Sequence, residues 1–261
     1  MDTPFRRWIE RHEEVIWPHL PLTHVTRAVF AEKILATGEL RPERCPVFSE
    51  DLTYTFYGRP AYRATSDQVI QLEASCPCCF IFEAQLMSSA SRVHAFDTGA
   101  FSKRLFNHVL DAGLQIADFA LDPDPNAANR LISAAFPAQE AYFEADRSNL
   151  TSPEEGADPW ELQGRSYLAL LKAQGRNEPD DRICTIEATF AETISLKENL
   201  RALVVPHTFW SEKGRSPQLQ AYADTGVEIG TYRFIPGRPP EHYHTLLEQS
   251  VRRLYEIWKY L

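Results

Sequence analysis

Residues 20–40, LPLTHVTRAVFAEKILATGEL, contain the pattern that decides the fold. We interpret the beginning of this stretch as a short strand that carries His24, followed by Thr26 as the N-cap of a helix. Apolar side chains recur at helical spacing through residues 28–37. Gly38 then suits the C-terminal cap, because glycine adopts a positive φ without steric cost. The stretch therefore predicts a histidine-bearing strand, a capped helix and a glycine turn.

The rest of the chain predicts both helices and strands, without an internal repeat or a linker long enough to divide it. Helices are expected at residues 4–18, 101–120, 129–142 (divided at Pro137), 160–175 and 243–260. Strands are expected at residues 69–72, 79–82, 182–190 and 202–206. This pattern predicts a single α+β domain over residues 1–261, with the first and the last helix flanking the core.

The composition excludes several classes of protein. The chain has 261 residues, 44% of them hydrophobic, which is enough for a sizeable core and excludes a disordered chain. Its formal net charge of −9 excludes a global basic field for nucleic acid, while a local basic groove stays open. No apolar run approaches the roughly 20 residues of a membrane span, and residues 1–14 do not resemble a secretory signal. Because the cysteines number five, we expect a reducing, cytoplasmic location.

Two motifs have the residue types of metal ligands, and neither is complete. Cys76, Cys78 and Cys79 place three thiols close together, yet a zinc site of this kind needs a second ligand pair at suitable spacing. His242 and His244 form a His-x-His pair without an obvious third ligand. We therefore expect no metal. The sequence also has no Gly-x-Ser-x-Gly elbow and no glycine-rich phosphate loop, which disfavours the enzyme classes that depend on them.

Residues 54–63, YTFYGRPAYR, combine tyrosines and arginines around a glycine. Aromatic rings suit stacking on a flat ligand, and guanidinium groups suit pairing with phosphates. An ordinary aromatic turn in the core explains the same composition. The sequence leaves both interpretations open.

Glu187 lies within the expected strand 182–190, where alternation places it on a mostly polar face. Such a face borders either solvent or a cleft. A plain surface glutamate is the simpler interpretation, and a catalytic carboxylate is the alternative. The turn at residues 96–100, FDTGA, is interpreted as structural, because aspartate and glycine are typical turn residues.

Together these segments resemble the ADP-ribosyltransferase fold, in the branch of DarT-type toxins. The histidine in strand 22–26 and the Ile-Leu-x-x-Gly turn that follows are similar to the start of those toxins. Residues 54–60 stand where an aromatic, arginine-containing segment is expected, and Glu187 stands where the catalytic glutamate is expected. The resemblance extends over residues 20–63 and 182–206.

The resemblance implies a split β-sheet core with peripheral helices, NAD as the substrate and no metal. It assigns Glu187 and His24 as catalytic residues and, for contact with NAD, His24, Thr26, Arg44, Tyr57, Arg59, Tyr62 and Arg63. The histidine would hold the ribose, a tyrosine would stack on the nicotinamide ring, and one of the arginines would pair with the pyrophosphate. The glutamate would stabilise the positive charge that develops on the ribose, and would orient or deprotonate the acceptor.

The expected function is therefore that of an NAD-dependent ADP-ribosyltransferase, a toxin or a phage-defence effector that modifies a protein or a nucleic acid. The acidic net charge argues against carrying over the DNA substrate of DarT-type toxins. An NAD glycohydrolase and a non-catalytic nucleotide- or protein-binding module of the same fold stay open as alternatives. So does a structural or immunity-type protein without an NAD site. A toxin would imply an antitoxin as partner, and no membrane partner is expected.

Overall fold

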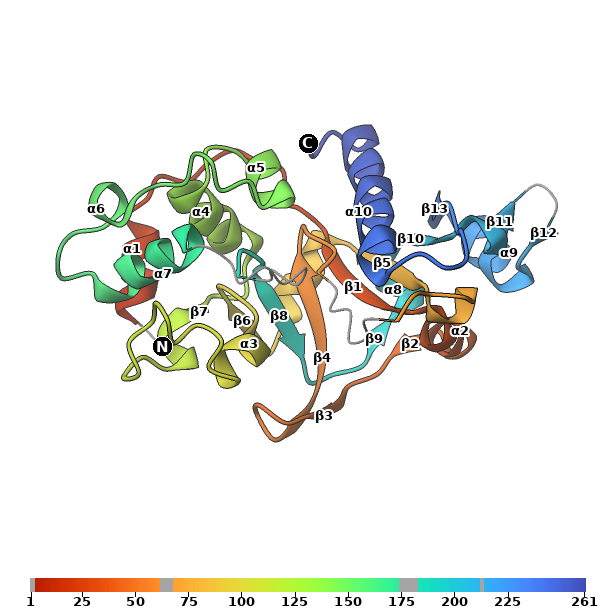
Figure 1. Ribbon diagram of the computed structural model, residues 1–261, viewed down its shortest axis with the longest axis horizontal. Coiled ribbons are helices and arrows are strands. Elements are labelled where there is room, and N and C mark those ends of the chain that lie inside the picture. The colour runs from red at the N-terminus through yellow and green to blue at the C-terminus, as the bar shows by residue number, and fades with distance from the viewer. Residues whose placement is uncertain (1–2, 62–67, 174–182, 212–213) are drawn as a thin grey trace.

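The protein has a mixed α+β architecture built around one long, mixed β-sheet (Figure 1). The computed structural model describes residues 3–61, 68–173, 183–211 and 214–261. In these residues no helix has both the length and the apolar character that a membrane crossing requires.

Within the described residues, the main sheet contains nine strands. Eight follow one another in the order β13–β10–β5–β1–β4–β8–β6–β7, and β3 pairs with the first residues of β4. Neighbours are antiparallel except for the parallel pair β10 and β13. The strands are β1 (Leu22–Arg27), β3 (Glu43–Cys45), β4 (Glu50–Tyr57), β5 (Pro77–Phe82), β6 (Arg92–His94), β7 (Ala120–Leu121), β8 (Glu187–Phe190), β10 (Leu200–Pro206) and β13 (Glu228–Tyr232).

Two short ribbons accompany the main sheet. One pairs β2 (Glu39–Leu40) with β9 (Ile194–Ser195), and the other pairs β11 (Trp210–Ser211) with β12 (Gly214–Arg215). The first ribbon joins the turn after the second helix to the segment that follows β8.

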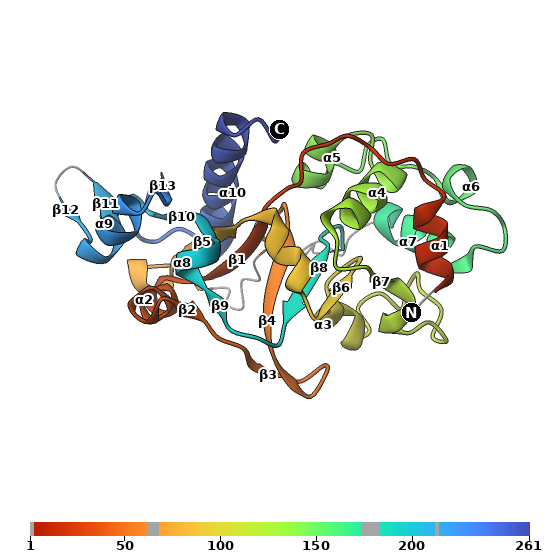
Figure 2. The ribbon, with the colours of Figure 1, turned by 180° about the vertical axis from the view of Figure 1, so that it is seen from behind.

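The helices surround the sheet at both of its ends. The α-helices are α1 (Pro4–Glu10), α2 (Ala28–Thr37), α3 (Thr98–Ser102), α4 (Pro125–Ala135), α5 (Gln139–Glu144), α6 (Pro153–Gly156), α7 (Leu162–Lys172), α8 (Leu196–Asn199), α9 (Pro217–Asp224) and α10 (Pro240–Ile257). The 3₁₀ helices are η1 (Glu73–Ser75), η2 (Ala84–Ser89), η3 (Ile116–Phe119) and η4 (His207–Phe209). Helix α10 packs on β13, β5 and β10, whereas α1 packs on α4 and α7 at the opposite end (Figures 1 and 2).

Strand β5 lies in the interior of the sheet between β1 and β10, and its sequence explains why. All six of its residues are buried, so neither of its faces meets solvent. Cys78 and Cys79 contribute to this strand as small buried side chains, and burial raises the pKa of the neighbouring Cys76 thiol to about 12. Among the described residues no three His, Cys, Asp or Glu side chains gather into a group that could hold a metal ion.

Two local predictions with clear end signals are confirmed, and the bounds of the first and last helices differ from those expected. Helix α2 spans the expected residues, and Gly38 ends it with a φ of 71°. The long helix expected near Pro137 is divided there into α4 and α5, as proline requires. The last helix begins slightly earlier than expected, at Pro240. The first helix is shorter than expected and ends at Glu10.

Three local predictions are wrong. Residues 101–120 form no long helix: α3 ends at Ser102, and Arg104 adopts a φ of 59°, which right-handed helix cannot continue through. Residues 69–72 form only an isolated bridge at Ile70 instead of a strand. Thr26 does not cap α2, because it still pairs with Cys78 in the sheet and the N-cap position belongs to Arg27.

Candidate functional site

The main sheet opens between β1 and β4. Strand β1 pairs with β5 along its whole length, from Leu22 to Arg27. It pairs with β4 only at Leu22 and Thr23. Pairing between the two strands therefore ends immediately before His24. The His24 side chain lies where β1 and β4 are no longer paired.

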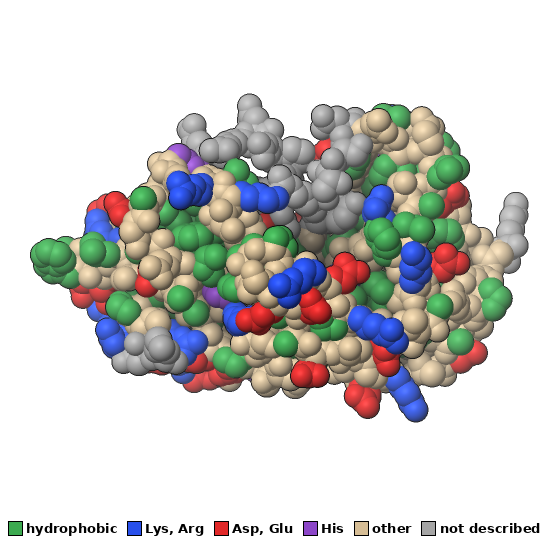
Figure 3. Space-filling view, turned by 90° about the horizontal axis from the view of Figure 1, so that it is seen from below, with side chains coloured by type: hydrophobic (Ala, Val, Ile, Leu, Met, Phe, Trp, Pro, Cys, Tyr) green, Lys and Arg blue, Asp and Glu red, His purple; other side chains and the backbone are tan. Residues whose placement is uncertain are grey.

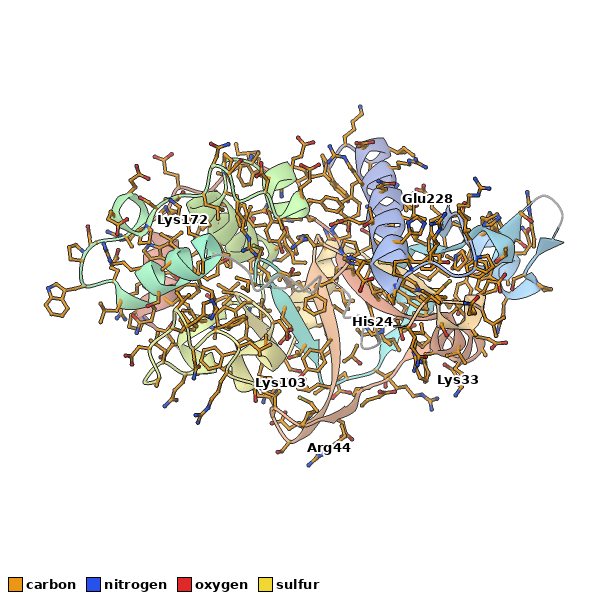
Figure 4. The ribbon with its side chains drawn as sticks, viewed as in Figure 1. His24, Lys33, Arg44, Lys103, Lys172 and Glu228 are labelled. Atoms are coloured by element: carbon orange, nitrogen blue, oxygen red, sulfur yellow. The ribbon has the colours of Figure 1, made fainter. Side chains whose placement is uncertain are left out.

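His24 spans this opening with its side chain (Figure 4). Its Nδ1 lies 2.8 Å from the carbonyl oxygen of Tyr54 on β4. A carbonyl only accepts hydrogen bonds, so Nδ1 carries the proton and Nε2 of the neutral ring is left as an acceptor. Burial lowers the pKa of His24, although the bond to Tyr54 and the charge of Glu43 act in the opposite direction. The ring is therefore neutral near pH 7 and presents an acceptor nitrogen.

Glu187 lies on β8, on the other side of β4. It is opposite Phe56 of β4 and opposite His94 of β6, and its side chain is fully buried. The Thr98 hydroxyl donates to Oε1 at 2.6 Å, and the Thr98 backbone N–H donates to Oε2 at 3.2 Å. The interpretation of Glu187 as a plain surface glutamate is therefore wrong. A buried carboxylate held by two donors on one residue is an arrangement with a fixed orientation.

The turn at residues 96–100 supplies these two donors. The Asp97 side chain accepts a hydrogen bond from the Gly99 N–H at 2.8 Å and forms the N-cap of α3. Thr98 is then the first residue of the helix, where a backbone N–H has no partner within the helix. This N–H points to the Glu187 carboxylate. The turn is thus structural, as the sequence predicted, and it also builds the site.

Tyr54 connects β4 to the same group. It lies opposite Thr189, two residues along β4 from the partner of Glu187, so its side chain is on the Glu187 face of the sheet. Its hydroxyl shares a 2.5 Å hydrogen bond with the Cys45 thiol. Burial is the main cause that raises the pKa of Tyr54, and the bond to Cys45 and the charge of Glu187 add to it, while Thr98 lowers it. One polar cluster is therefore formed by Tyr54, Thr98 and Glu187, and we call it the Glu187 cluster.

Simple alternation would place His24 and Glu187 on opposite faces of a continuous sheet. The sheet is not continuous here, because pairing between β1 and β4 ends at Thr23. Tyr54 lies between the two residues: its carbonyl accepts a hydrogen bond from His24, and its side chain is on the same face as Glu187. Strands β1 and β8 lie on either side of β4, about 10 Å apart at two strand spacings.

Tyr57 has a different role from the one the sequence predicted. It is fully buried, its hydroxyl donates to the Asn129 side chain at 2.9 Å, and it accepts from the Leu20 N–H at 3.0 Å. A ring enclosed in this way has no open face for nicotinamide. The assignment of Tyr57 to NAD is therefore wrong, and the residue belongs to the core.

Arg59 also makes interactions within the protein. Its Nε donates to the Phe143 carbonyl at 2.7 Å, Nη1 donates to the Thr185 hydroxyl at 3.3 Å, and Nη2 lies 3.6 Å from the Glu248 carboxylate. These bonds fasten the end of β4 to α5, to the approach to β8 and to α10. The guanidinium is thus committed to holding the frame of the site, which argues against pairing with a pyrophosphate.

Two other expected residues that the structure describes, Arg44 and Thr26, are not gathered at the opening. Arg44 lies exposed on β3, 3.8 Å from Asp51, at the edge of the molecule (Figure 4). Thr26 lies farther along β1 than His24 and is partly exposed. Tyr62 and Arg63 lie outside the described residues. Of the expected set, the structure therefore brings His24 and Glu187 to the two sides of one strand.

The surface charge agrees with the acidic composition. Seen from below, Lys and Arg side chains are interspersed with Asp and Glu, without a continuous basic band on this face (Figure 3). A surface that tracks a long nucleic-acid backbone needs such a band.

No protein-family model, no curated protein and no solved structure matches the chain. The chemistry of the site therefore rests on its own geometry.

Two residues of the cluster were not assigned to the site from the sequence. Tyr54 is part of the aromatic stretch, but only the position of β4 next to β8 distinguishes it from Tyr57. Thr98 follows a capping aspartate, so a free backbone donor could be foreseen at that position. Its partner could not, because Glu187 is far away in the sequence.

Proposed function

We propose that the protein is an NAD-dependent ADP-ribosyltransferase, with the core of that fold opened between β1 and β4. The observation that carries this proposal is the arrangement of His24 and Glu187 on either side of β4, with Tyr54 between them. A neutral histidine acceptor, an aromatic ring and a fixed carboxylate are the groups that this reaction requires.

His24 and Tyr54 supply the binding interactions. The Nε2 atom of His24 accepts a hydrogen bond from a ribose hydroxyl, because Nδ1 is already engaged by the Tyr54 carbonyl. The Tyr54 ring, which is partly exposed, takes the stacking role expected earlier for Tyr57. The Cys45 hydrogen bond fixes the orientation of the Tyr54 phenol.

Glu187 supplies the electrostatic stabilisation. When the bond between ribose C1′ and the nicotinamide nitrogen breaks, nicotinamide leaves as a neutral molecule with the electron pair, and positive charge develops on the ribose. A carboxylate preorganised by Thr98 stabilises this charge strongly where water is excluded. The same carboxylate then takes the proton of the acceptor. Because the Glu187 side chain is closed off from bulk water, contact with the ribose requires the groups around it to move.

The test is the release of nicotinamide from NAD by the purified protein. We expect wild type to release nicotinamide, and we expect Glu187→Gln to reduce the rate by about 100-fold or more, the effect of losing one preorganised electrostatic group. His24→Ala should raise KM for NAD, because it removes an acceptor of the ribose. Glu192→Gln is the matched control, since Glu192 is exposed just beyond the end of β8 and should leave the rate unchanged.

A binding titration with NAD accompanies this assay, since a strict transferase releases little nicotinamide without its acceptor. Saturable NAD binding that His24→Ala weakens supports the proposal. A wild-type protein that neither binds NAD nor releases nicotinamide contradicts it.

A further inference from the structure

A pocket lies directly beside the Glu187 cluster. It has a volume of about 690 Å³ and is lined by β6, by Phe48 before β4, by α3 with the stretch that follows it, and by Arg6 from α1. We call it the β6 pocket. His94 is one of its lining residues and is also the cross-strand partner of Glu187. Directly opposite residues of an antiparallel pair have their Cβ atoms about 5 Å apart on the same face. The pocket wall therefore contains the direct cross-strand neighbour of Glu187.

Arginines outnumber carboxylates in the lining of the β6 pocket, although two of the three arginines are ion-paired with carboxylates just outside it. Arg6, Arg92 and Arg104 line it, against one carboxylate, Asp111. This balance is the reverse of that of the whole chain, whose net charge is −9. The arrangement favours an anionic ligand.

Two of the arginines already have partners within the protein, including a carboxylate for each. Arg92 forms a bidentate pair with Glu50 at 2.9–3.0 Å and stacks over the Phe48 ring. Arg6 binds Asp122 and the carbonyl oxygens of Ala120 and Leu121. Because Arg6 and Arg92 are already held by these partners, they act on a ligand through their electric field more than through new hydrogen bonds.

Arg104 is different, because its guanidinium makes no hydrogen bond or ion pair with any residue in the described part of the chain. Its backbone has a φ of 59°, a left-handed conformation that is unfavourable for a side chain other than glycine. The aromatic residues on either side hold it there: Phe101 stacks on Phe96, and Phe106 packs edge-on against the same ring. The fold thus fixes a turn that presents an uncommitted guanidinium at the pocket.

His94 adds a polar group on the side nearest to Glu187. Only 3% of its surface is exposed, and its Nδ1 has no hydrogen-bond partner among the described residues. Burial and the charge of Arg92 lower the pKa of His94 to about 4, so the ring is neutral at physiological pH. A neutral imidazole beside the pocket can hydrogen-bond a ligand without adding charge.

The dimensions select a small ligand. The volume lies within the range of about 300–1,000 Å³ that is typical of small-molecule pockets. A polynucleotide would also need basic side chains along its path, and the face in Figure 3 has acidic and basic side chains interspersed. A dianionic phosphate pairs with the Arg104 guanidinium through more negative charge than a carboxylate, which has a single negative charge to offer.

We propose that the β6 pocket binds the acceptor of the transfer reaction, and that this acceptor is a small phosphate monoester whose phosphate pairs with Arg104. This inference rests on the proposed function. It replaces the macromolecular acceptor expected from the sequence with a small molecule that bears both a phosphate and a hydroxyl.

The reaction balances as follows. The bond between ribose C1′ of NAD and the nicotinamide nitrogen breaks, and the electron pair leaves with neutral nicotinamide. The acceptor hydroxyl oxygen forms the new bond to C1′, and its proton passes to the Glu187 carboxylate. No oxidant or reductant is needed.

Calorimetric titration with ribose 5-phosphate and with inorganic phosphate, in the absence of NAD, tests the pocket directly. We expect saturable binding of both probes to wild type, and we expect Arg104→Asn to weaken it about tenfold, as for the loss of a charged hydrogen bond. Asparagine tolerates the left-handed backbone, so this variant should keep the fold. Lys103→Ala is the matched control, because Lys103 is exposed, adjacent in sequence, labelled in Figure 4 and outside the pocket lining.

Failure of this inference is distinguishable from failure of the proposed function. Nicotinamide release without binding of either phosphate probe overturns the inference alone. Stronger binding of succinate than of inorganic phosphate also overturns it, as does equal weakening by Lys103→Ala and Arg104→Asn. Phosphate binding that needs Arg104, combined with stimulation of nicotinamide release by ribose 5-phosphate, supports it. Phosphate binding without any interaction with NAD overturns the acceptor role and the proposed function together.

Discussion

The two halves of the main sheet differ in what they bury. Strands β5 and β10 bury apolar residues along almost their whole length. On the other side of the opening, β4, β6 and β8 bury a set of polar side chains: Thr53, Thr55, His94, Glu187 and Thr189. Burying polar groups costs free energy unless they are hydrogen-bonded, so a fold that needed only stability would not place them there. Under the proposed function, the β5–β10 half is a scaffold and the β4–β8–β6 half carries the chemistry.

The largest effect on stability is expected in the scaffold. Phe82 is fully buried in β5, stacked with Phe80. Phe82→Ala should reduce the free energy of unfolding by about 3–5 kcal/mol, because it leaves a cavity in a close-packed core. Chemical denaturation measures this change. Nicotinamide release per folded molecule should stay the same.

The milder Phe82→Leu serves if the alanine variant does not fold. A loss of activity larger than the loss of folded protein would show that the β5 half takes part in the chemistry, against the distinction drawn here.

The next effect is a loss of stability at acidic pH, which is expected from His94 in the β4–β8–β6 half. The pKa of His94 is lowered from 6.5 to about 4 by burial. Unfolding restores the ordinary pKa of His94. Between the lowered and the ordinary pKa the unfolded state therefore binds more protons than the native state. The free energy of unfolding falls as the pH falls through this range. At the acidic end of this range the loss in the free energy of unfolding is about 3 kcal/mol, and above the ordinary pKa of His94 there is no loss.

Urea denaturation of wild type and His94→Gln at neutral pH and near the lowered pKa measures this contribution. We expect the variant to lose less stability on acidification than wild type. Some acid dependence should remain, because the pKa of His24 is lowered as well. Identical acid dependence in the two proteins would mean that His94 is not held neutral in the native state.

A smaller effect is expected at Thr98, whose hydrogen bonds hold the Glu187 carboxylate. Thr98→Val keeps the shape of the side chain but removes the hydroxyl that donates to Glu187 at 2.6 Å. We expect kcat for nicotinamide release to fall about tenfold with little change in KM, since a hydrogen bond to a charged group contributes about 1.5–3 kcal/mol. Steady-state kinetics measures both constants. Thr98→Ser should recover most of kcat, and failure of serine to do so would argue that the effect is one of packing.

The smallest effects are expected at Tyr57 and Tyr54 of β4, and they differ between the two residues. Tyr57→Phe should cost about 1 kcal/mol of stability, because the Leu20 N–H and the Asn129 side chain lose a buried partner. KM for NAD should not change. Tyr54→Ala should raise KM for NAD, since that ring is partly exposed beside the Glu187 cluster. A KM effect of Tyr57→Phe equal to that of Tyr54→Ala would restore the original assignment.

Local signals in the sequence predicted local structure. The positive φ of Gly38 and the break at Pro137 follow from properties of single residues, and both were foreseen. The stretch 101–120 has helical spacing, but its aromatic residues pack around Phe96 and Phe119 in turns instead. Tertiary packing of the aromatics overrides the local preference here.

The candidate site depends on pairings between distant segments, which a single sequence does not reveal. Alternation correctly grouped Glu187 with Thr189, although the expected strand 182–190 begins only at Glu187, and it gave no sign that β4 and β6 would enclose the strand on both sides. For the same reason the sequence could not choose between Tyr54 and Tyr57. His24 was assigned to the site because the strand that carries it and the glycine turn that follows resemble the start of DarT-type toxins; in the structure it lies in the interior of β1.

Hydrogen–deuterium exchange with and without NAD tests the difference between the two halves most directly. We predict that NAD slows exchange in peptides that cover residues 96–102 and the beginning of β4, and leaves those that cover β10 and β13 unchanged. The same experiment on Glu187→Gln controls for protein that binds NAD without turning it over. Protection confined to β10 and β13, or no change at saturating NAD, would contradict the assignment of the chemistry to the β4–β8–β6 half.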